Sequence, residues 1–162
     1  MPTDPRQLKF PGTCHPHTVA IHGYWLRKCG ARRMPRRSDI DPAEMMPKWL
    51  PGICIVEVVP DERRYVYRLV GSGEVELRGE DPTGKSVTVG FFGFSAEDAL
   101  NCYDRVLRNR VPLLDSSPFT TVAGRYVTKE TIFLPLSDDG TRVSKILVFT
   151  CSRDLQLDFT PV

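Results

Sequence analysis

Apolar residues between Thr18 and Cys29 recur at helical spacing and predict an amphipathic helix at the start of the domain. Thr18 suits the N-cap, and Gly30 suits the position just past the last turn. Residues 1–16, in contrast, are proline-rich and have little periodicity. We expect them to form a flexible N-terminal arm.

A second helical start follows near residue 41. Asp41 suits an N-cap, Pro42 suits the first helical position, and Glu44 stands three residues after the cap, as in a capping box. Pro47 and Pro51 keep this helix short.

Most of the remaining pattern is typical of strands. Residues 53–59 are apolar and β-branched, residues 64–70 alternate, and the turn at 60–63 joins them into a predicted antiparallel hairpin. Because residues 53–59 do not alternate, we expect this strand to be covered on both faces. Three more strands are predicted over 113–121, 125–136 and 143–152.

Two helical segments separate the first two strands from the last three. A short one begins at Ser72, and a longer one begins near Ser95 and runs to about Asn109. Pro112 and Pro118 favour an edge or bulged position for the strand over 113–121. The pattern predicts an α+β fold, in which an antiparallel sheet carries the central helices on one face and the first helix covers the other.

Composition is that of one globular domain. The chain has 162 residues, of which 41% are hydrophobic and 26% charged. No apolar run approaches the roughly 20 residues that span a membrane, and the N-terminus has no apolar leader segment. We therefore expect a soluble cytoplasmic protein with no membrane contact. The five cysteines are widely spaced without a Cys-x-x-Cys pair, which indicates neither a disulfide framework nor a redox pair.

Six basic residues and no acidic one lie between Arg27 and Arg37. They could meet an anion or an acidic partner, or form a solvated linker. Arg32 and Arg36 have the spacing of an arginine motif in PilZ domains, but the accompanying Asp/Asn-x-Ser-x-x-Gly is absent. The interpretation that we favour is a local structural or anion-binding network at the joint after the first helix. Its members are Arg36, Arg37, Ser38, Asp39 and Asp41.

Several short motifs occur in a fixed order along the chain. They are Trp25, residues 34–42 (MPRRSDIDP), 49–51 (WLP), 67–72 (YRLVGS), 79–84 (GEDPTG) and 134–140 (LPLSDDG). Together they resemble a bacterial family of short, mostly single-domain PAS-like proteins, over roughly residues 18–151. Met34 and Pro82 depart from the usual residues of that family.

The resemblance implies a five-stranded antiparallel sheet with helices around a pocket for a small molecule. It implies no catalytic residues, and it carries over no ligand. Members are expected to signal through protein contacts. PAS domains often pair through an N-terminal helix, so we expect a homodimer. The interface candidates are Val19, Ile21, Trp25 and Leu26.

An aromatic and aliphatic set faces the expected space between sheet and helices, either as plain core or as the wall of a ligand pocket. The pocket candidates are Tyr67, Leu69, Val75, Phe91, Phe94, Tyr103, Leu107, Phe119 and Phe133.

The sequence gives little support for a metal site, a haem, a flavin photosensor or a catalytic motif. Cys14, His15, His17, His22 and Cys29 are close in sequence, but their spacing matches no standard metal site, so no metal is predicted. No histidine follows residue 22, which disfavours a haem in the core. Cys102 is the one cysteine placed for a flavin photosensor, but it lies outside any recognised photoactive motif. No G-x-S-x-G, P-loop or Rossmann pattern is present.

We therefore predict a flexible arm over 1–16, a PAS-like domain over 17–152 and a tail over 153–162. The expected function is non-catalytic signalling through protein contacts with an unidentified partner. The alternative is a sensor whose small apolar or nucleotide ligand changes partner binding. No helix-turn-helix pattern is present, so we expect no nucleic-acid binding. The sequence requires no cofactor and leaves its identity unknown.

Overall fold

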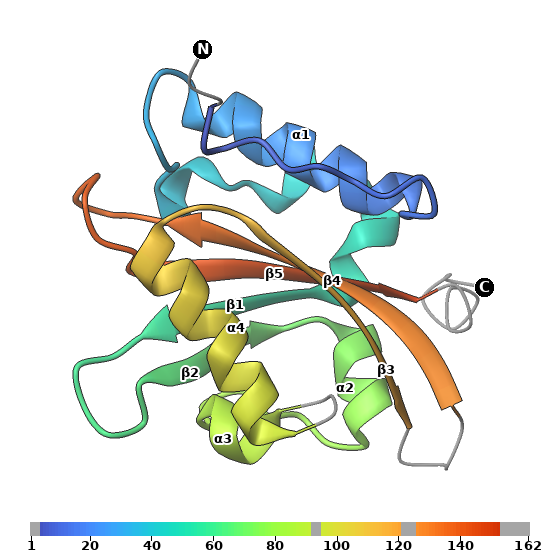
Figure 1. Ribbon diagram of the computed structural model, residues 1–162. Coiled ribbons are helices and arrows are strands. Elements are labelled where there is room, and N and C mark those ends of the chain that lie inside the picture. Colours follow the sequence, from blue (N-terminus) through green and yellow to red (C-terminus); the bar gives the residue numbers. More distant parts are fainter. Residues whose placement is uncertain (1–3, 92–94, 121–125, 153–162) are drawn as a thin grey trace.

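The computed structural model describes residues 4–91, 95–120 and 126–152, apart from the side chains of residues 117–120, 126–128 and 152. The chain begins with helix α1 (Pro16–Cys29) and three 3-10 turns, η1 (Arg37–Asp39), η2 (Pro42–Glu44) and η3 (Pro47–Gly52). There follow β1 (Ile53–Val58), β2 (Tyr65–Val70), α2 (Ser72–Arg78), α3 (Val87–Gly90), α4 (Ala96–Asn109), β3 (Leu113–Thr120), β4 (Tyr126–Leu136) and β5 (Lys145–Ser152) (Figure 1).

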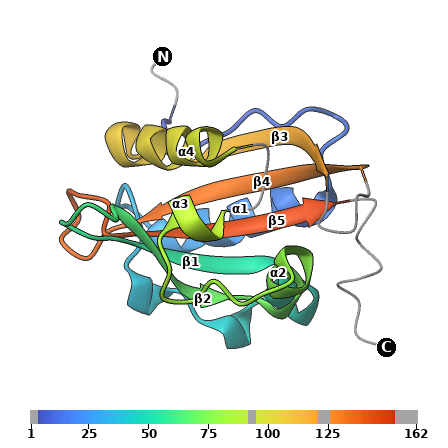
Figure 2. The ribbon, with the colours of Figure 1, turned by 90° about the horizontal axis from the view of Figure 1, so that it is seen from below.

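The strands form one antiparallel sheet in the order β2-β1-β5-β4-β3, which Figure 2 shows from bottom to top. The predicted hairpin of β1 and β2 and the five-stranded sheet are confirmed. The edge position that Pro112 and Pro118 predicted for β3 is also confirmed, because β3 pairs only with β4 among the described strands. β1 and β5 become neighbours, so the first hairpin and the last strand meet at the centre of the sheet.

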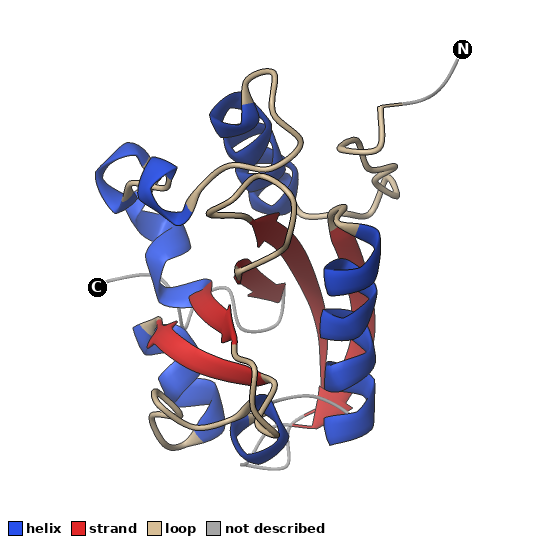
Figure 3. Cartoon of the chain, turned by 90° about the vertical axis from the view of Figure 1, so that its left-hand side faces the viewer, coloured by secondary structure: helices blue, strands red, loops and turns tan. Residues whose placement is uncertain are grey.

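Helices cover both faces of this sheet. α1 packs against β4 and β5 from behind in Figure 2, whereas α3 lies in front. Figure 3 likewise shows the strands between α4 and α1. Because successive strand residues point to opposite faces, Glu130, Ile132 and Leu134 share the α1 face, and Lys129 and Phe133 share the α4 face. This double cover explains why the central strands are apolar on both sides.

The centre of the α1 face is an apolar core. Ile21 and Trp25 have no exposed surface, and the Trp25 Nε1–H donates to the Pro135 carbonyl over 2.9 Å. An indole in an apolar core normally finds such an acceptor. The predicted apolar stripe of α1 therefore faces the sheet.

The N-terminus of α1 is held differently from the expectation. The N-cap is His15, whose Nδ1 accepts from the His17 amide over 3.1 Å, and Thr18 is fully buried in the first turn. The Thr18 hydroxyl donates to Glu130 over 2.8 Å, and the His15 amide donates to the same carboxylate over 3.0 Å. A carboxylate is favourable there because the first helical amides carry partial positive charge.

The segment before α1 also differs from the expected flexible arm over 1–16. Arg6 donates to the Gly30 carbonyl over 2.8 Å, its own carbonyl lies 2.8 Å from His22 Nε2, and Leu8 and Phe10 pack on the core. Residues 4–15 therefore return along α1 and make long-range contacts. Residues 1–3 and the predicted tail over 153–162 lie outside the described residues.

The joint after α1 is a set of local contacts. Asp41 caps η2 as predicted, with the Ala43 amide donating to its Oδ1 over 2.9 Å. A capping box would also have the Glu44 carboxylate accept from the Asp41 amide, and this part of the prediction is wrong. The Asp41 amide donates to the Tyr24 hydroxyl instead, and Glu44 pairs with Lys28. Tyr24 lies on α1 close enough to Asp41 for its hydroxyl to take the place of the Glu44 carboxylate as acceptor.

Candidate ligand-binding site

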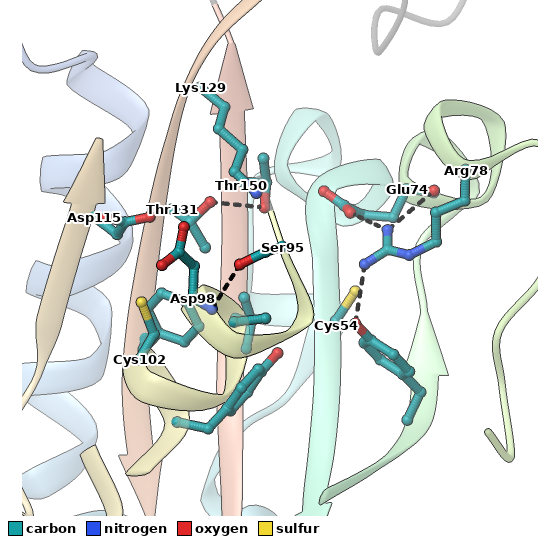
Figure 4. Close-up of a pocket in the computed structure, with 15 residues that line it drawn as sticks. Cys54, Glu74, Arg78, Ser95, Asp98, Cys102, Asp115, Lys129, Thr131 and Thr150 are labelled. Carbon is teal, nitrogen blue, oxygen red and sulfur yellow. Dashed lines mark hydrogen bonds and ion pairs between the residues drawn. The ribbon is translucent and has the colours of Figure 1, made fainter. Parts of the chain in front are cut away.

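A pocket lies between the sheet and the helices α2 and α4 (Figure 4), with a cavity volume of about 60 Å³. All five strands contribute to one wall, and the other wall comes from helices α2 and α4. The residues that line it are Cys54, Tyr67, Glu74, Arg78, Ser95, Asp98, Ala99, Cys102, Tyr103, Asp115, Lys129, Thr131, Phe133, Val148 and Thr150.

A buried ion pair occupies one side of the pocket. Arg78 and Glu74 stand one helical turn apart on α2, with side chains only 9% and 3% exposed and Nη1 2.5 Å from Oε2. Arg78 Nε donates to the Gly90 carbonyl over 2.8 Å, and Nη2 donates to the Tyr67 hydroxyl over 3.2 Å. Burial opposes the charge, but the Glu74 carboxylate outweighs it and the pKa of Arg78 is raised.

Glu74 is only half satisfied. Its Oε2 accepts from Arg78, while Oε1 is buried without a hydrogen-bond partner among the described residues. An unsatisfied buried acceptor costs about 1–3 kcal/mol, and more when it is charged. A partner for Oε1 inside the pocket would recover that free energy.

The opposite wall is also polar. Lys129 extends from β4 toward Thr150, and the hydroxyls of Thr131 and Thr150 lie 3.3 Å apart across β4 and β5 (Figure 4). Burial lowers the pKa of Lys129, while the charges of Glu74 and Asp115 raise it in part. Positive and negative groups thus face the same small space from different elements.

Aromatic rings and thiols complete the lining. Tyr103 packs edge-on against Phe133, with ring centroids 5.2 Å apart. Burial raises the pKa of the Cys102 thiol to about 11 and raises that of Cys54 further. Burial thus opposes ionisation of both thiols in the pocket wall.

The predicted pocket residues divide into three groups. Tyr67, Tyr103 and Phe133 line the pocket. Leu69 does not, because it is 40% exposed and points away, and Leu107 lines a separate hollow near the β4–β5 turn. Val75 and Phe91 are half-buried outside the lining. Phe94 and the Phe119 side chain lie outside the described residues.

Sequence reasoning missed the polar members of the site. Glu74, Lys129 and Thr150 line the pocket, and none of them was among the pocket candidates. The Glu74-x-x-x-Arg78 spacing was a usable signal, because residues four apart share a helix face. Nothing in the spacing indicated that this face is buried.

Two of the four interface candidates are corrected. Ile21 and Trp25 are fully buried in the chain's own core, so they offer no surface to a second copy. Val19 is 42% exposed and Leu26 is half-buried against the core. The sequence predicted that the first helix covers the sheet, but its spacing did not show which of these apolar residues lie against the sheet and which stay exposed.

The basic segment between Arg27 and Arg37 makes local contacts and a long-range one, in which Arg33 donates to the Asn109 carbonyl at the end of α4 over 3.1 Å. Asp39 pairs with Arg32 over 2.9 Å and accepts from the Arg36 amide, and Arg37 donates to the Ile40 carbonyl over 3.1 Å. No described contact involves the Ser38 side chain. No cluster of three metal-binding side chains occurs in the described part of the chain.

These features define a class of protein: a five-stranded antiparallel sheet with helices packed over a small pocket is the architecture of a PAS domain. A PAS domain family model matches residues 13–149, and the chain belongs to the PAS domain family. No curated protein sequence matches the chain.

Several solved structures share the fold at low sequence identity. A fungal LOV domain photoreceptor is 16% identical with a TM-score of 0.51, over 85% of this chain and 94% of its own. The photo-excited blue-light photoreceptor Vivid is 10% identical with a TM-score of 0.51, over 85% and 97%. The light state of Aureochrome1 LOV is 9% identical with a TM-score of 0.50, over 74% and 95%. Within the described residues, no helix is both long and apolar enough to cross a membrane.

Proposed function

We propose that this PAS domain is a non-catalytic sensor that binds a small polar molecule in the pocket under α2 and α4. The observation that carries the proposal is the half-satisfied Glu74 carboxylate, buried beside a cavity of about 60 Å³. A buried charge without its full set of partners costs free energy, and a small ligand with a hydrogen-bond donor would supply the missing partner.

Arg78 provides a route from the pocket to the surface. It connects Glu74 on α2 to the Gly90 carbonyl at the end of α3, and the neighbouring Val89 is 66% exposed. Gly90 sits so close to Tyr67 and Pro82 that an added Cβ would lie 2.6 Å from Pro82 Cβ. A ligand that rearranges the ion pair would therefore move the exposed α3, where a protein partner could respond.

Flavin does not fit the pocket. The names of the similar structures include LOV photoreceptors, but ligand pockets for molecules of drug size have volumes of about 300–1,000 Å³, well above the volume found here. A haem has no histidine in the described lining.

The second candidate function is an adaptor that acts through protein contacts without a ligand. The exposed apolar residues favour it, since Leu50, Leu69 and Val89 are 38%, 40% and 66% exposed. In either case we propose a cytoplasmic protein whose signalling partner is separate, and a homodimer that does not use Ile21 or Trp25.

Native mass spectrometry of freshly purified protein, with an absorption spectrum of the same sample, tests the proposal. We expect a small added mass that disappears when the protein is unfolded and desalted, and absorption from aromatic residues alone. Bare protein that no small polar molecule stabilises in a thermal-shift screen would contradict sensing and leave the adaptor. The same spectrum would show the oligomeric state.

A further inference from the structure

Charged groups of both signs line the pocket, because Asp98 on α4 and Asp115 on β3 lie there beside the Arg78–Glu74 pair and Lys129. Glu74 approaches from α2, and Lys129 approaches from β4, with Thr150 between them on β5 (Figure 4). Each charge interacts electrostatically with the other, since the Glu74 carboxylate acts on the titration of Lys129. Opposite charges on facing walls favour a guest with the complementary arrangement.

The lining argues against ligands that carry a single charge. A simple anion would meet the carboxylates of Glu74 and Asp115, and Arg78 is already engaged with Glu74, Gly90 and Tyr67. A simple cation would meet Lys129 and Arg78 inside the same cavity. An apolar guest would leave the buried oxygen of Glu74 unsatisfied.

Size restricts the guest further. A water molecule occupies about 10–15 Å³ on the scale on which this cavity measures about 60 Å³, so the cavity holds about four to six water-sized groups. A small amino acid such as glycine or alanine is of this size. A nucleotide is far larger.

We propose that the pocket binds a small zwitterion with the chemistry of an α-amino acid, its ammonium group donating to Glu74 and its carboxylate accepting from Lys129. The hydroxyls of Thr131 and Thr150 lie beside this axis and complete the polar contacts. The rings of Tyr103 and Phe133 bound the side where a short apolar side chain would lie. This inference rests on the proposed sensory function and names the class of its ligand.

Isothermal titration with glycine and L-alanine tests the inference. The comparison probes are ethylamine, which carries only an ammonium group, propionate, which carries only a carboxylate, and propionamide, which is polar and neutral. We expect binding of an amino acid and none of the single-feature probes. Glu74→Gln and Lys129→Gln should each weaken that binding by about 10- to 100-fold, the usual worth of a charge-assisted hydrogen bond.

Glu76→Gln is the matched control, because Glu76 lies on the same helix but is exposed. It should leave the affinity unchanged. Thermal melts of each variant establish folding, and if Glu74→Gln does not fold, Lys129→Gln alone decides the role of the opposite wall.

The outcomes separate this inference from the proposed function. Binding of ethylamine or propionamide as tight as that of an amino acid would overturn the zwitterion and keep a polar-ligand sensor. Loss of affinity in Glu76→Gln as large as in Glu74→Gln would overturn recognition at this pocket. Binding of none of the five probes would overturn the zwitterion. Bare protein in the mass spectrum that no small polar molecule stabilises in the thermal-shift screen would overturn the sensor as well.

Discussion

The two faces of the sheet are built from adjacent residues of the same strands, yet they differ in chemistry. Behind the sheet, α1 lays Ile21 and Trp25 on an apolar surface with no exposed area. In front, α2 and α4 enclose ion-paired Arg78 and Glu74 beside a cavity. Alternation along β4 alone sends Ile132 to one face and Thr131 to the other.

This contrast indicates that the two faces of the sheet have different roles. Burying apolar area stabilises a fold by about 25 cal/mol per Å², whereas buried charges return little net stability after desolvation. The α1 face therefore holds the domain together. The pocket face retains polar groups that packing alone would not favour, which is consistent with binding.

The largest expected effect on stability comes from removing the Trp25 indole on the α1 face. Trp25→Ala should lower the free energy of unfolding by about 3–5 kcal/mol, because it opens a cavity and leaves the Pro135 carbonyl without its donor. Urea unfolding measures the change. Val19→Ala, on the exposed side of the same helix, should cost less than about 0.5 kcal/mol. Equal costs for the two would show that α1 does not anchor the domain.

Breaking the ion pair should cost about 3 kcal/mol. Arg78→Met leaves the Glu74 carboxylate buried without its cation, and the double variant with Glu74→Gln should recover part of the loss because no buried charge remains. Urea unfolding of the single and double variants gives the coupling free energy. If the losses in the free energy of unfolding are additive, the two side chains do not interact. The pocket face would then hold no buried ion pair, and the difference between the two faces would not stand.

The carboxylate at the start of α1 should matter less. Glu130→Gln weakens the contacts with Thr18 and the His15 amide, and we expect a loss of about 1–2 kcal/mol in urea unfolding. Glu97→Gln is a matched control, since Glu97 is exposed in the first turn of α4. An unchanged stability in Glu130→Gln would show that the helix start is held by His15 alone.

The smallest effect concerns pH. Burial lowers the pKa of His22 below its usual value of about 6.5, against the opposing hydrogen bond with the Arg6 carbonyl. Stability from the neutral ring is therefore present above pH 6.5 and is lost as pH falls through the folded-state pKa. Unfolding at pH 7.5 and 5.5 measures this. His22→Phe should reduce the slope without abolishing it, because His17 is shifted in the same direction.

Much of the fold was predictable because it rests on local rules. Gly30 ends α1, Ser95 caps α4 through the Asp98 amide over 3.1 Å, and the edge prolines indicated where β3 lies. The candidate site was predicted only in part. Three aromatic lining residues were found, but Leu69 is exposed although it alternates with Tyr67, because the β1–β2 register shifts between these two positions and the sequence pattern does not show such an irregularity.

The sequence by itself determined the element order, the hairpins and the resemblance to PAS domains, because spacing, caps and turn residues act over a few positions. Tertiary structure alone decided that Trp25 is core, that residues 4–15 fold back along α1, and that Glu74 and Lys129 share a cavity. Those outcomes depend on which segments meet across the sheet. Burial then sets whether a charged side chain is solvated or held for a ligand.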